Sequence, residues 1–348
     1  MPAVVSDGGS DAGTGLALLG RGAHTSGSVE LVEIAGFADG LRGATDLAFH
    51  PTEDHQLWVT NQADNSMLII SRAGSPEETI ERRTSGGAEH FFAMPSGIAM
   101  GTAGTFATCQ ATDAITQPST PADFMGPTLW PADLAAFTGG HSSHLDMLHN
   151  SPSAEGIAWD HDNAFWVLDG YHASITFYDF AMDHGAGGED HSGATITRWV
   201  EGEVAPFAGI RSHIELDHTT GLLYVADTGN RRIAVLDTAS GSPGAAIGPD
   251  YDGATMTARA GGVLTTLVDL APLGIERPSG LALRAGTIYV GDASNGTIHA
   301  FDLTGQLLDW IDLSDRFDSL GGLELDPEGR LYFTTSSPAS VMRLAPLG

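Results

Sequence analysis

Three of the fourteen histidines in this sequence of 348 residues share a spacing that suggests a metal site. His90 stands seven residues before Gly97, and His149 stands seven residues before Gly156. His213 takes, in its own segment, the position that these two glycines hold in theirs. Three imidazoles that leave a fourth position open form the kind of site in which zinc activates water, and imidazole also suits copper. We therefore predict that His90, His149 and His213 bind a transition metal, zinc in preference to copper.

These histidines also have a simpler interpretation, in which each is a separate loop or core residue bonded to a backbone carbonyl. Secondary candidates for metal ligands are His144, His172 and Cys109. Cys109 is the only cysteine, so the chain forms no internal disulfide, and a small core residue is the alternative role for it.

Tyr171 and Arg211 are the candidate catalytic residues. Tyr171 lies in a predicted hairpin, DGYH, where it could transfer a proton, clamp a substrate or simply cap the hairpin by packing. Arg211 stands two residues before His213 and could hold a substrate carboxylate beside a metal, although an arginine there is more typical of a surface.

A glycine-rich acidic loop, DHGAGGEDH at residues 183 to 191, contains His184 and His191. Its carboxylates and carbonyls could hold calcium as a structural ion, but their spacing matches no EF-hand. A solvated acidic loop is the more typical interpretation of such a segment. We expect it on the face opposite to the other histidines.

The elements that position these residues form a repeat. An apolar strand signature recurs six times, and the central residues of its copies stand 42 to 67 residues apart. The copies are Thr45–Phe49, Ser96–Met100, Glu155–Trp159, Ser212–Leu216, Ser279–Leu283 and Gly321–Leu325. A run of aromatic and β-branched residues follows each copy, and turn residues follow in most units. Units of this length are typical of four-stranded blades, so the sequence predicts an all-β, six-bladed β-propeller.

The two ends of the repeat complement each other. The last unit ends after only three strands, while an additional strand, Val29–Ile34, precedes the first unit. We expect this strand to close the ring as the outer strand of the last blade. The predicted organisation is a flexible leader at residues 1–28 and one propeller domain at residues 29–348. An apolar insertion at about residues 111–148 either covers the tunnel mouth or packs on the side of the second blade.

The segments LYVADTGNRRIAVLD, at residues 223 to 237, and IYVGDASNGTIHAFD resemble NHL repeats, which build six-bladed propellers. HFFAMPSGIA, at residues 90 to 99, is similar to segments of the peptidyl-hydroxyglycine amidating lyases. That resemblance implies zinc held by three histidines over the tunnel, with His90 as the best match. It also implies a tyrosine that assists loss of the amide nitrogen and an arginine that holds the substrate carboxylate, roles that Tyr171 and Arg211 could fill.

EGIAW, at residues 155 to 159, resembles the calcium-dependent lactonases of the gluconolactonase type. In that family the glutamate, here Glu155, is a metal ligand, and an asparagine at another blade entry completes the site. This sequence has serine at the corresponding positions, Ser96 and Ser279.

Composition excludes several classes of partner. The formal net charge is −29, and all fifteen basic residues are arginine, so the surface repels phosphate and we expect no nucleic acid to bind. The apolar run near the N-terminus is too short for a membrane span or a signal-peptide core. We expect a monomer without a membrane span, acting on a small molecule or a peptide. The leader could be a tether left after export or simply a boundary of the sequence, and we expect a periplasmic or extracellular protein.

The first hypothesis is an exported metalloenzyme, a lyase or hydrolase of a small polar substrate at the tunnel mouth. The second is a non-catalytic propeller that binds a peptide, glycan or protein partner at the same mouth. A calcium-dependent, lactonase-like hydrolase ranks third.

Overall fold

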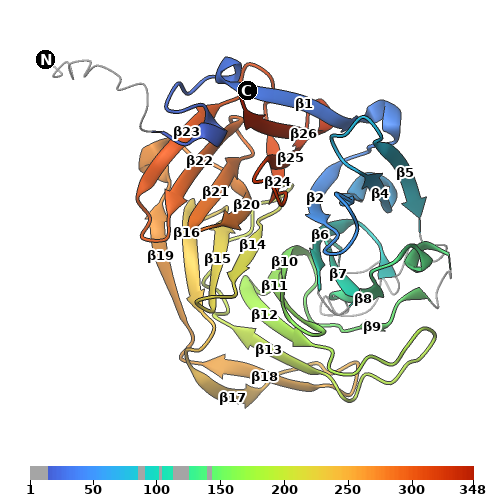
Figure 1. The fold of residues 1–348 in the computed structure, drawn as a ribbon. Helices are drawn as coiled ribbons and strands as arrows, with labels where there is room; N and C mark the ends of the chain where they lie inside the picture. Colours follow the sequence, from blue (N-terminus) through green and yellow to red (C-terminus); the bar gives the residue numbers. More distant parts are fainter. Residues whose placement is uncertain (1–14, 85–90, 102–103, 113–124, 139–142) are drawn as a thin grey trace, which may run out of the picture.

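Six sheets stand around a central axis in the computed structural model (Figure 1). The structure describes residues 15–84, 91–101, 104–112, 125–138 and 143–348. Each sheet contains a four-stranded blade, and the first strand of each blade is nearest the axis. This arrangement confirms the six-bladed β-propeller. We call the end of the tunnel where the inner strands begin the entry face, and the other end the exit face.

The blades follow one another along the chain. Blades one and two consist of β2 (Ala44–Phe49), β3 (Leu57–Asn61), β4 (Ser66–Ser71) and β5 (Thr79–Thr84), then β6 (Pro95–Met100), β7 (Thr105–Gln110), β8 (Thr128–Pro131) and β9 (Asp146–Met147). Blades three and four consist of β10 (Ala154–His161), β11 (Ala164–Asp169), β12 (Ser174–Asp179) and β13 (Thr195–Trp199), then β14 (Ile214–Asp217), β15 (Leu222–Asp227), β16 (Arg232–Asp237) and β19 (Val263–Asp269). Blades five and six consist of β20 (Pro278–Arg284), β21 (Thr287–Asp292), β22 (Thr297–Asp302) and β23 (Leu307–Asp312), then β24 (Leu320–Leu325), β25 (Leu331–Ser336), β26 (Ala339–Pro346) and β1 (Val29–Gly36).

Short 3₁₀ turns connect some of these strands. They are Ala17–Leu19, Ser26–Ser28, Phe37–Asp39, Gln62–Asp64, Leu134–Phe137 and Ala271–Leu273. Among the described residues, no helix has the length and apolar character needed to cross a membrane.

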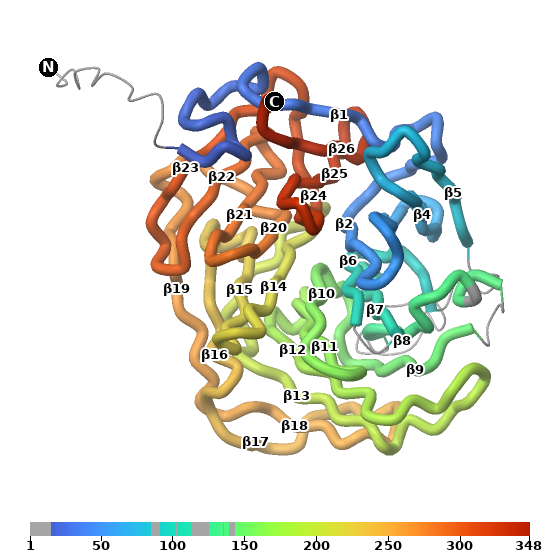
Figure 2. Tube along the Cα trace, in the orientation of Figure 1, coloured from blue at the N-terminus to red at the C-terminus, as the bar shows by residue number. Residues whose placement is uncertain are grey.

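The N-terminal strand closes the ring as predicted. β1 pairs antiparallel with β26, from Val29 opposite Pro346 to Gly36 opposite Ser340. The blue and red ends of the tube therefore lie side by side in Figure 2. Ile34 is buried by this pairing, in a cluster with residues of blades one and six. Closure covers the edge of β26, which would otherwise offer unpaired backbone groups to other chains.

The predicted flexible leader differs from the structure over residues 15–28, which pack on blade five. Leu19 is fully buried, and the backbone N–H of Leu16 donates to Asp309 at 2.7 Å. The His24 ring stacks on Trp310, with 4.2 Å between centroids. Apolar burial and aromatic stacking hold this segment on the blade, and its glycine-rich composition concealed those contacts in the sequence.

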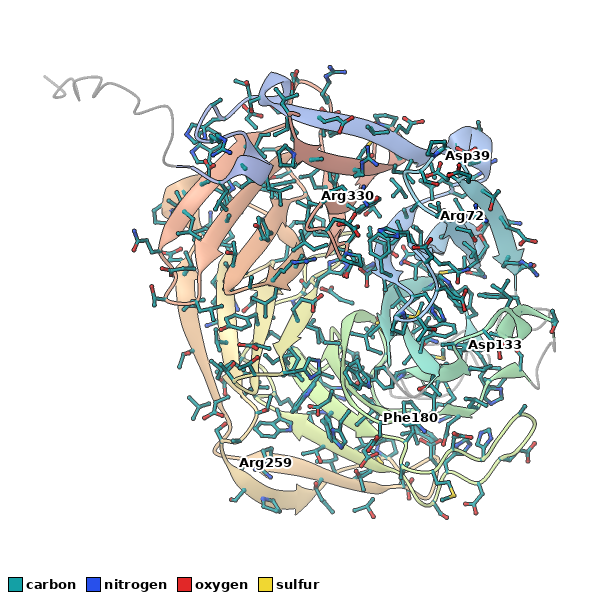
Figure 3. All side chains as sticks on the ribbon, in the orientation of Figure 1. Asp39, Arg72, Asp133, Phe180, Arg259 and Arg330 are labelled. Atoms are coloured by element: carbon teal, nitrogen blue, oxygen red, sulfur yellow. The ribbon has the colours of Figure 1, made fainter. Side chains whose placement is uncertain are left out.

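Blade four contains an additional hairpin that extends blade three. β17 (Ser242–Ala246) and β18 (Thr255–Ala260) lie between β16 and β19 in the chain, but β18 pairs in parallel with β13 of blade three. Arg259, labelled in Figure 3, lies over the Trp199 ring at 4.7 Å and fixes the hairpin further. This hairpin accounts for the long interval between the fourth and fifth strand signatures.

The predicted insertion at about residues 111–148 contains the outer strands of blade two, β8 and β9. Its described apolar residues pack on the side of the blade. Trp130 and Phe137 join a buried cluster with Trp58 of blade one and Phe106 of blade two. The structure therefore supports side packing for the part of the insertion that it describes.

Candidate functional site

The first residue of each strand signature forms a ring of contacts between blades on the entry side. Thr45 and Ser96 donate hydroxyl hydrogen bonds to the carbonyls of Pro95 and Ala154 in the next blade, at 3.0 and 2.6 Å. Ser279 bonds the sixth blade in the same way, at 2.7 Å. The hydroxyl groups of these short side chains therefore link the inner strands of neighbouring blades.

Glu155 is the only carboxylate at this ring position. Its side chain accepts a hydrogen bond from the backbone N–H of Ser212 in blade four, at 3.0 Å, and the residue is 3% exposed. Burial raises the pKa of Glu155 to about 7, although the Ser212 bonds and the positive charges of Arg211 and His213 counteract part of this rise. A carboxyl with this pKa exchanges protons near neutral pH, as a general acid or base must.

The second residue of each signature points toward the axis and the next blade. Four of the six positions hold glycine. There is no room for a side chain at Gly156, because a Cβ there would lie 2.5 Å from the carbonyl oxygen of Ser212. The exceptions are Asp46 in blade one and His213 in blade four, which face each other from opposite sides of the ring. The Oδ1 atom of Asp46 lies 3.3 Å from Nε2 of His213, and both residues are buried. Together they span the tunnel.

Backbone groups fix the orientation of this pair. The N–H groups of Leu47 and Ile98 each donate to the Asp46 carboxylate at 2.9 Å. Nδ1 of His213 donates to the Ser279 carbonyl at 3.0 Å, so Nε2 needs a second proton in order to bond Asp46. Burial lowers the pKa of His213, but the Asp46 carboxylate outweighs that effect and the pKa lies above its ordinary value.

The fourth residue of each signature lines the exit side. Alanine holds this position except in blades four and six, where Glu215 and Glu324 stand. Both carboxyls line two cavities, of about 230 and 190 Å³. Burial raises the pKa of Glu324 to about 8 and also raises that of Glu215, and mutual repulsion adds to the effect for Glu215. Both carboxyls of the exit side therefore release their protons at higher pH than an exposed glutamate does.

A cavity of about 220 Å³ opens on the entry side. Thr45, Ser279 and Gly321 of the ring line it, together with the half-buried Arg211. Among the described residues, no hydrogen bond or ion pair engages the Arg211 guanidinium. Its charge is nevertheless close enough to lower the Glu155 pKa. The predicted role of Arg211, in which it holds a substrate carboxylate, stays a prediction.

The structure places two members of the predicted histidine trio with different partners. His149 binds Asp252 twice, through its backbone N–H at 2.8 Å and Nδ1 at 2.6 Å. Asp252 lies in the loop between β17 and β18, whereas His213 faces Asp46 in the tunnel. His90 lies outside the described residues, so the three-histidine site stays a prediction.

Tyr171 and His172 lie in the hairpin after β11. The His172 backbone N–H and Nδ1 bond Asp169, at 2.9 and 2.8 Å, while the Tyr171 ring packs against His172 and is 53% exposed. This geometry supports the capping alternative for the hairpin. Cys109 is fully buried beside Ser96, and burial raises its pKa to about 12, which disfavours the thiolate that metals bind.

Two groups of side chains among the described residues could hold a metal ion. One consists of Asp146, His184 and His191, and the other of His55, Asp326 and Glu328. Neither group contains a member of the predicted trio. The sequence analysis also missed Asp46, Glu215 and Glu324. Aligning the six signatures would reveal them, because each departs from glycine or alanine at a repeated position.

Comparison with known proteins identifies the architecture. No family model matches the chain, and no curated protein matches it. A gluconolactonase from Xanthomonas campestris is 14% identical, with a TM-score of 0.57 over 93% of this chain and 91% of that one. Streptogramin B lyase is 12% identical, with a TM-score of 0.52 over 91% of this chain and 97% of that one.

An auxiliary nutrient binding protein from Bacteroides thetaiotaomicron is 11% identical, with a TM-score of 0.59 over 91% of this chain and 76% of that one. The chain has the six-bladed β-propeller fold. These propellers include enzymes as well as binding proteins. At this level of sequence identity, the structural similarity establishes the fold but not the function.

Proposed function

We propose that the protein hydrolyses a small carboxyl ester or lactone in the entry-side cavity. The observation that carries this proposal is the electrostatic link between two residues: Arg211 lines the cavity without a protein partner among the described residues, and its charge acts on Glu155, a carboxyl buried behind the lining with a pKa of about 7. A general base that titrates near neutrality and a cation that can receive negative charge are the two groups that ester hydrolysis requires.

The reaction follows from these roles. The ionised Glu155 carboxylate takes a proton from water as its oxygen forms a bond to the substrate carbonyl carbon. Arg211 stabilises the negative charge that develops on the carbonyl oxygen. The C–O bond to the leaving oxygen then breaks, and that oxygen takes the proton from Glu155. The carboxylic acid product ionises in water, and Arg211 holds the carboxylate until it leaves.

The size of the cavity limits the substrate. A volume of about 220 Å³ is smaller than most drug-sized sites, and the Asp46–His213 pair links blades one and four across the ring. A small molecule therefore enters and leaves by the entry face. The fold shared with a gluconolactonase is consistent with a lactone substrate.

The calcium ion implied by the resemblance to lactonases does not fit this site. Calcium takes six to eight oxygen ligands. Here Glu155 is the only carboxylate at the ring position, the other five positions hold threonine, serine or glycine, and neither group of potential metal ligands among the described residues contains Glu155. We therefore place no step of the reaction at calcium. Export and the predicted zinc site remain proposals on which this reaction does not depend.

The test uses a panel of aliphatic lactones and short carboxyl esters, with hydrolysis followed by proton release at constant pH. We expect kcat to rise with pH around pH 7, because Glu155 must be ionised. Glu155→Gln should lower kcat by about 10²-fold or more. Arg211→Ala should reduce kcat/KM more than Arg211→Lys, whereas Arg72→Ala, at an exposed arginine, should have no effect. Full activity in Glu155→Gln, or no hydrolysis of any substrate by the wild type, would reject the proposal.

A non-catalytic binding propeller is the second candidate, and Arg211 favours a ligand with a carboxylate. The shared fold with an auxiliary nutrient binding protein is consistent with it. In that case small carboxylates bind the wild type and Glu155→Gln equally well by calorimetry, Arg211→Ala abolishes binding, and no substrate in the panel is hydrolysed.

A further inference from the structure

A second cluster of chemically active side chains lies away from the tunnel, at the outer edges of blades two and three. Asp146 belongs to β9, the outer strand of blade two, and His184 and His191 belong to the loop between β12 and β13. Each residue offers one ligand atom, and these atoms lie within 4.8 Å of one another. We propose that Asp146, His184 and His191 bind a divalent transition-metal ion of the zinc class, which fastens the loop of blade three to blade two.

His184 provides the main evidence. Its Nδ1 lies 2.7 Å from the carbonyl oxygen of Gly185, so Nδ1 carries the proton and Nε2 presents a lone pair. Nε2 is buried, has no hydrogen-bond partner among the described residues and points at Oδ1 of Asp146, 3.9 Å away. Two hydrogen-bond acceptors thus face each other where only 2% of the His184 side chain is exposed.

A cation between these two atoms resolves the conflict. An unpaired buried acceptor costs free energy, and so does the repulsion between a lone pair and a carboxylate. Metal-binding histidines usually donate their other ring N–H to a backbone carbonyl, which is the bond that Gly185 accepts here. The orientation of His184 is therefore that of a ligand.

His191 and Asp146 complete the set. Nδ1 of His191 lies 2.6 Å from Oδ1 of Asp146, and this carboxylate also accepts the backbone N–H of Met147 at 2.7 Å. The Asp146 side chain is 1% exposed, while 19% of the His191 side chain is exposed. An ion can therefore reach the cluster from the His191 side, and binding would displace the proton that the two residues share.

The loop and its surroundings are shaped around His184. A Cβ on Gly188 would lie 2.5 Å from the His184 carbonyl oxygen, so the chain returns against His184 only because residue 188 is glycine. The His144 ring packs edge-on against His184, with 5.3 Å between centroids. This contact helps to hold the His184 ring in place.

The ligand types select the class of ion. Two imidazoles and one carboxylate suit zinc, copper or iron(II), whereas calcium and magnesium prefer oxygen ligands alone. The carboxylate and the buried setting favour a tetrahedral zinc site. This site is independent of Glu155 and Arg211, so its failure would leave the proposed hydrolysis untouched.

The test is zinc binding by the full-length chain after removal of metals with a chelator. We expect calorimetry to give about one equivalent of zinc at this cluster, and zinc to raise the melting temperature. His184→Ala combined with His191→Ala should abolish both effects, and Asp146→Asn should weaken binding at least tenfold. His161→Ala is the matched control, because His161 also bonds an aspartate, Asp160, but belongs to no group of three ligands.

A measurement on the wild type protects the test against variants that fail to fold. Zinc should shield the partly exposed His191 from chemical modification by diethylpyrocarbonate, as read by peptide mass spectrometry, and should leave His161 reactive. No zinc binding by the wild type would overturn the proposal. So would zinc binding that persists in the double variant but is lost in His149→Ala or His213→Ala, since the ion would then occupy the predicted trio.

Discussion

Replacing Glu155 by glutamine changes the pH dependence of folding stability by an amount that follows from the structure. In the unfolded chain this carboxyl ionises near pH 4.5, whereas burial raises the folded-state pKa to about 7. The folded state therefore holds a proton that the unfolded state has lost, and the free energy of unfolding falls as pH rises between these values. A difference of about 2.5 units corresponds to about 3 kcal/mol. Glutamine keeps the acceptor for the Ser212 N–H but does not ionise.

The assay is urea denaturation of the wild type and Glu155→Gln at pH values from 4 to 8.5. The stability of the wild type relative to the variant should decline by about 3 kcal/mol between pH 4.5 and 7 and become constant above pH 7. Glu77→Gln, at an exposed glutamate, controls for the loss of one negative charge. If the difference between wild type and Glu155→Gln changes by less than about 1 kcal/mol over this range, Glu155 is hydrated and cannot serve as a base tuned to neutral pH.

Two further predictions concern the stability of the propeller, one at the Asp46–His213 pair and one at the closing strand β1. Asp46→Asn removes the carboxylate that faces His213 and should cost about 3 kcal/mol at pH 6. Because the His213 pKa is raised, the stabilisation is present below the ordinary histidine pKa and disappears as pH rises through the folded-state value, so urea denaturation at pH 9 should show a smaller cost. An equal cost at both pH values would mean that the contact is not ionic. Ile34→Ala should lower the unfolding free energy by about 2 to 4 kcal/mol by leaving a cavity under the closing strand, whereas Phe37→Ala, at a residue 68% exposed, should cost almost nothing. A small loss for Ile34→Ala would show that β1 is not needed to close the ring.

The inner strands and the closing strand were predictable because their signals are local and repeated. Each signature gives an apolar strand bounded by small or polar residues, and six copies require a ring with one strand exchanged between the ends. The hairpin β17–β18 has no such signal. β17 is largely exposed, so it shows no alternation between apolar and polar residues, and β18 owes its place to pairing with β13 of the preceding blade.

The candidate site was predictable only in part. Comparison of the signatures drew attention to His213, because it replaces a repeated glycine. Its partner Asp46 was missed because TDLAF fits an apolar strand pattern and because the contact joins opposite blades. The shared register of His90 and His149 could not reveal Asp252, which reaches His149 from the inserted hairpin. Contacts across the ring or between insertions depend on tertiary structure that a repeat pattern does not encode.

The Asp46–His213 pair also separates the two ends of the tunnel. Four of the six signatures have glycine at this position, so Asp46 and His213 supply the only side chains there. Arg211 lines the entry-side cavity, Glu215 and Glu324 line the exit-side cavities, and no described residue lines a cavity on both sides. Because the Asp46–His213 contact lies between these cavities, we expect a ligand at Arg211 to enter and leave by the entry face. If the entry side is a catalytic site, substrate and product must use the same mouth, which favours the turnover of small molecules over the processing of chains.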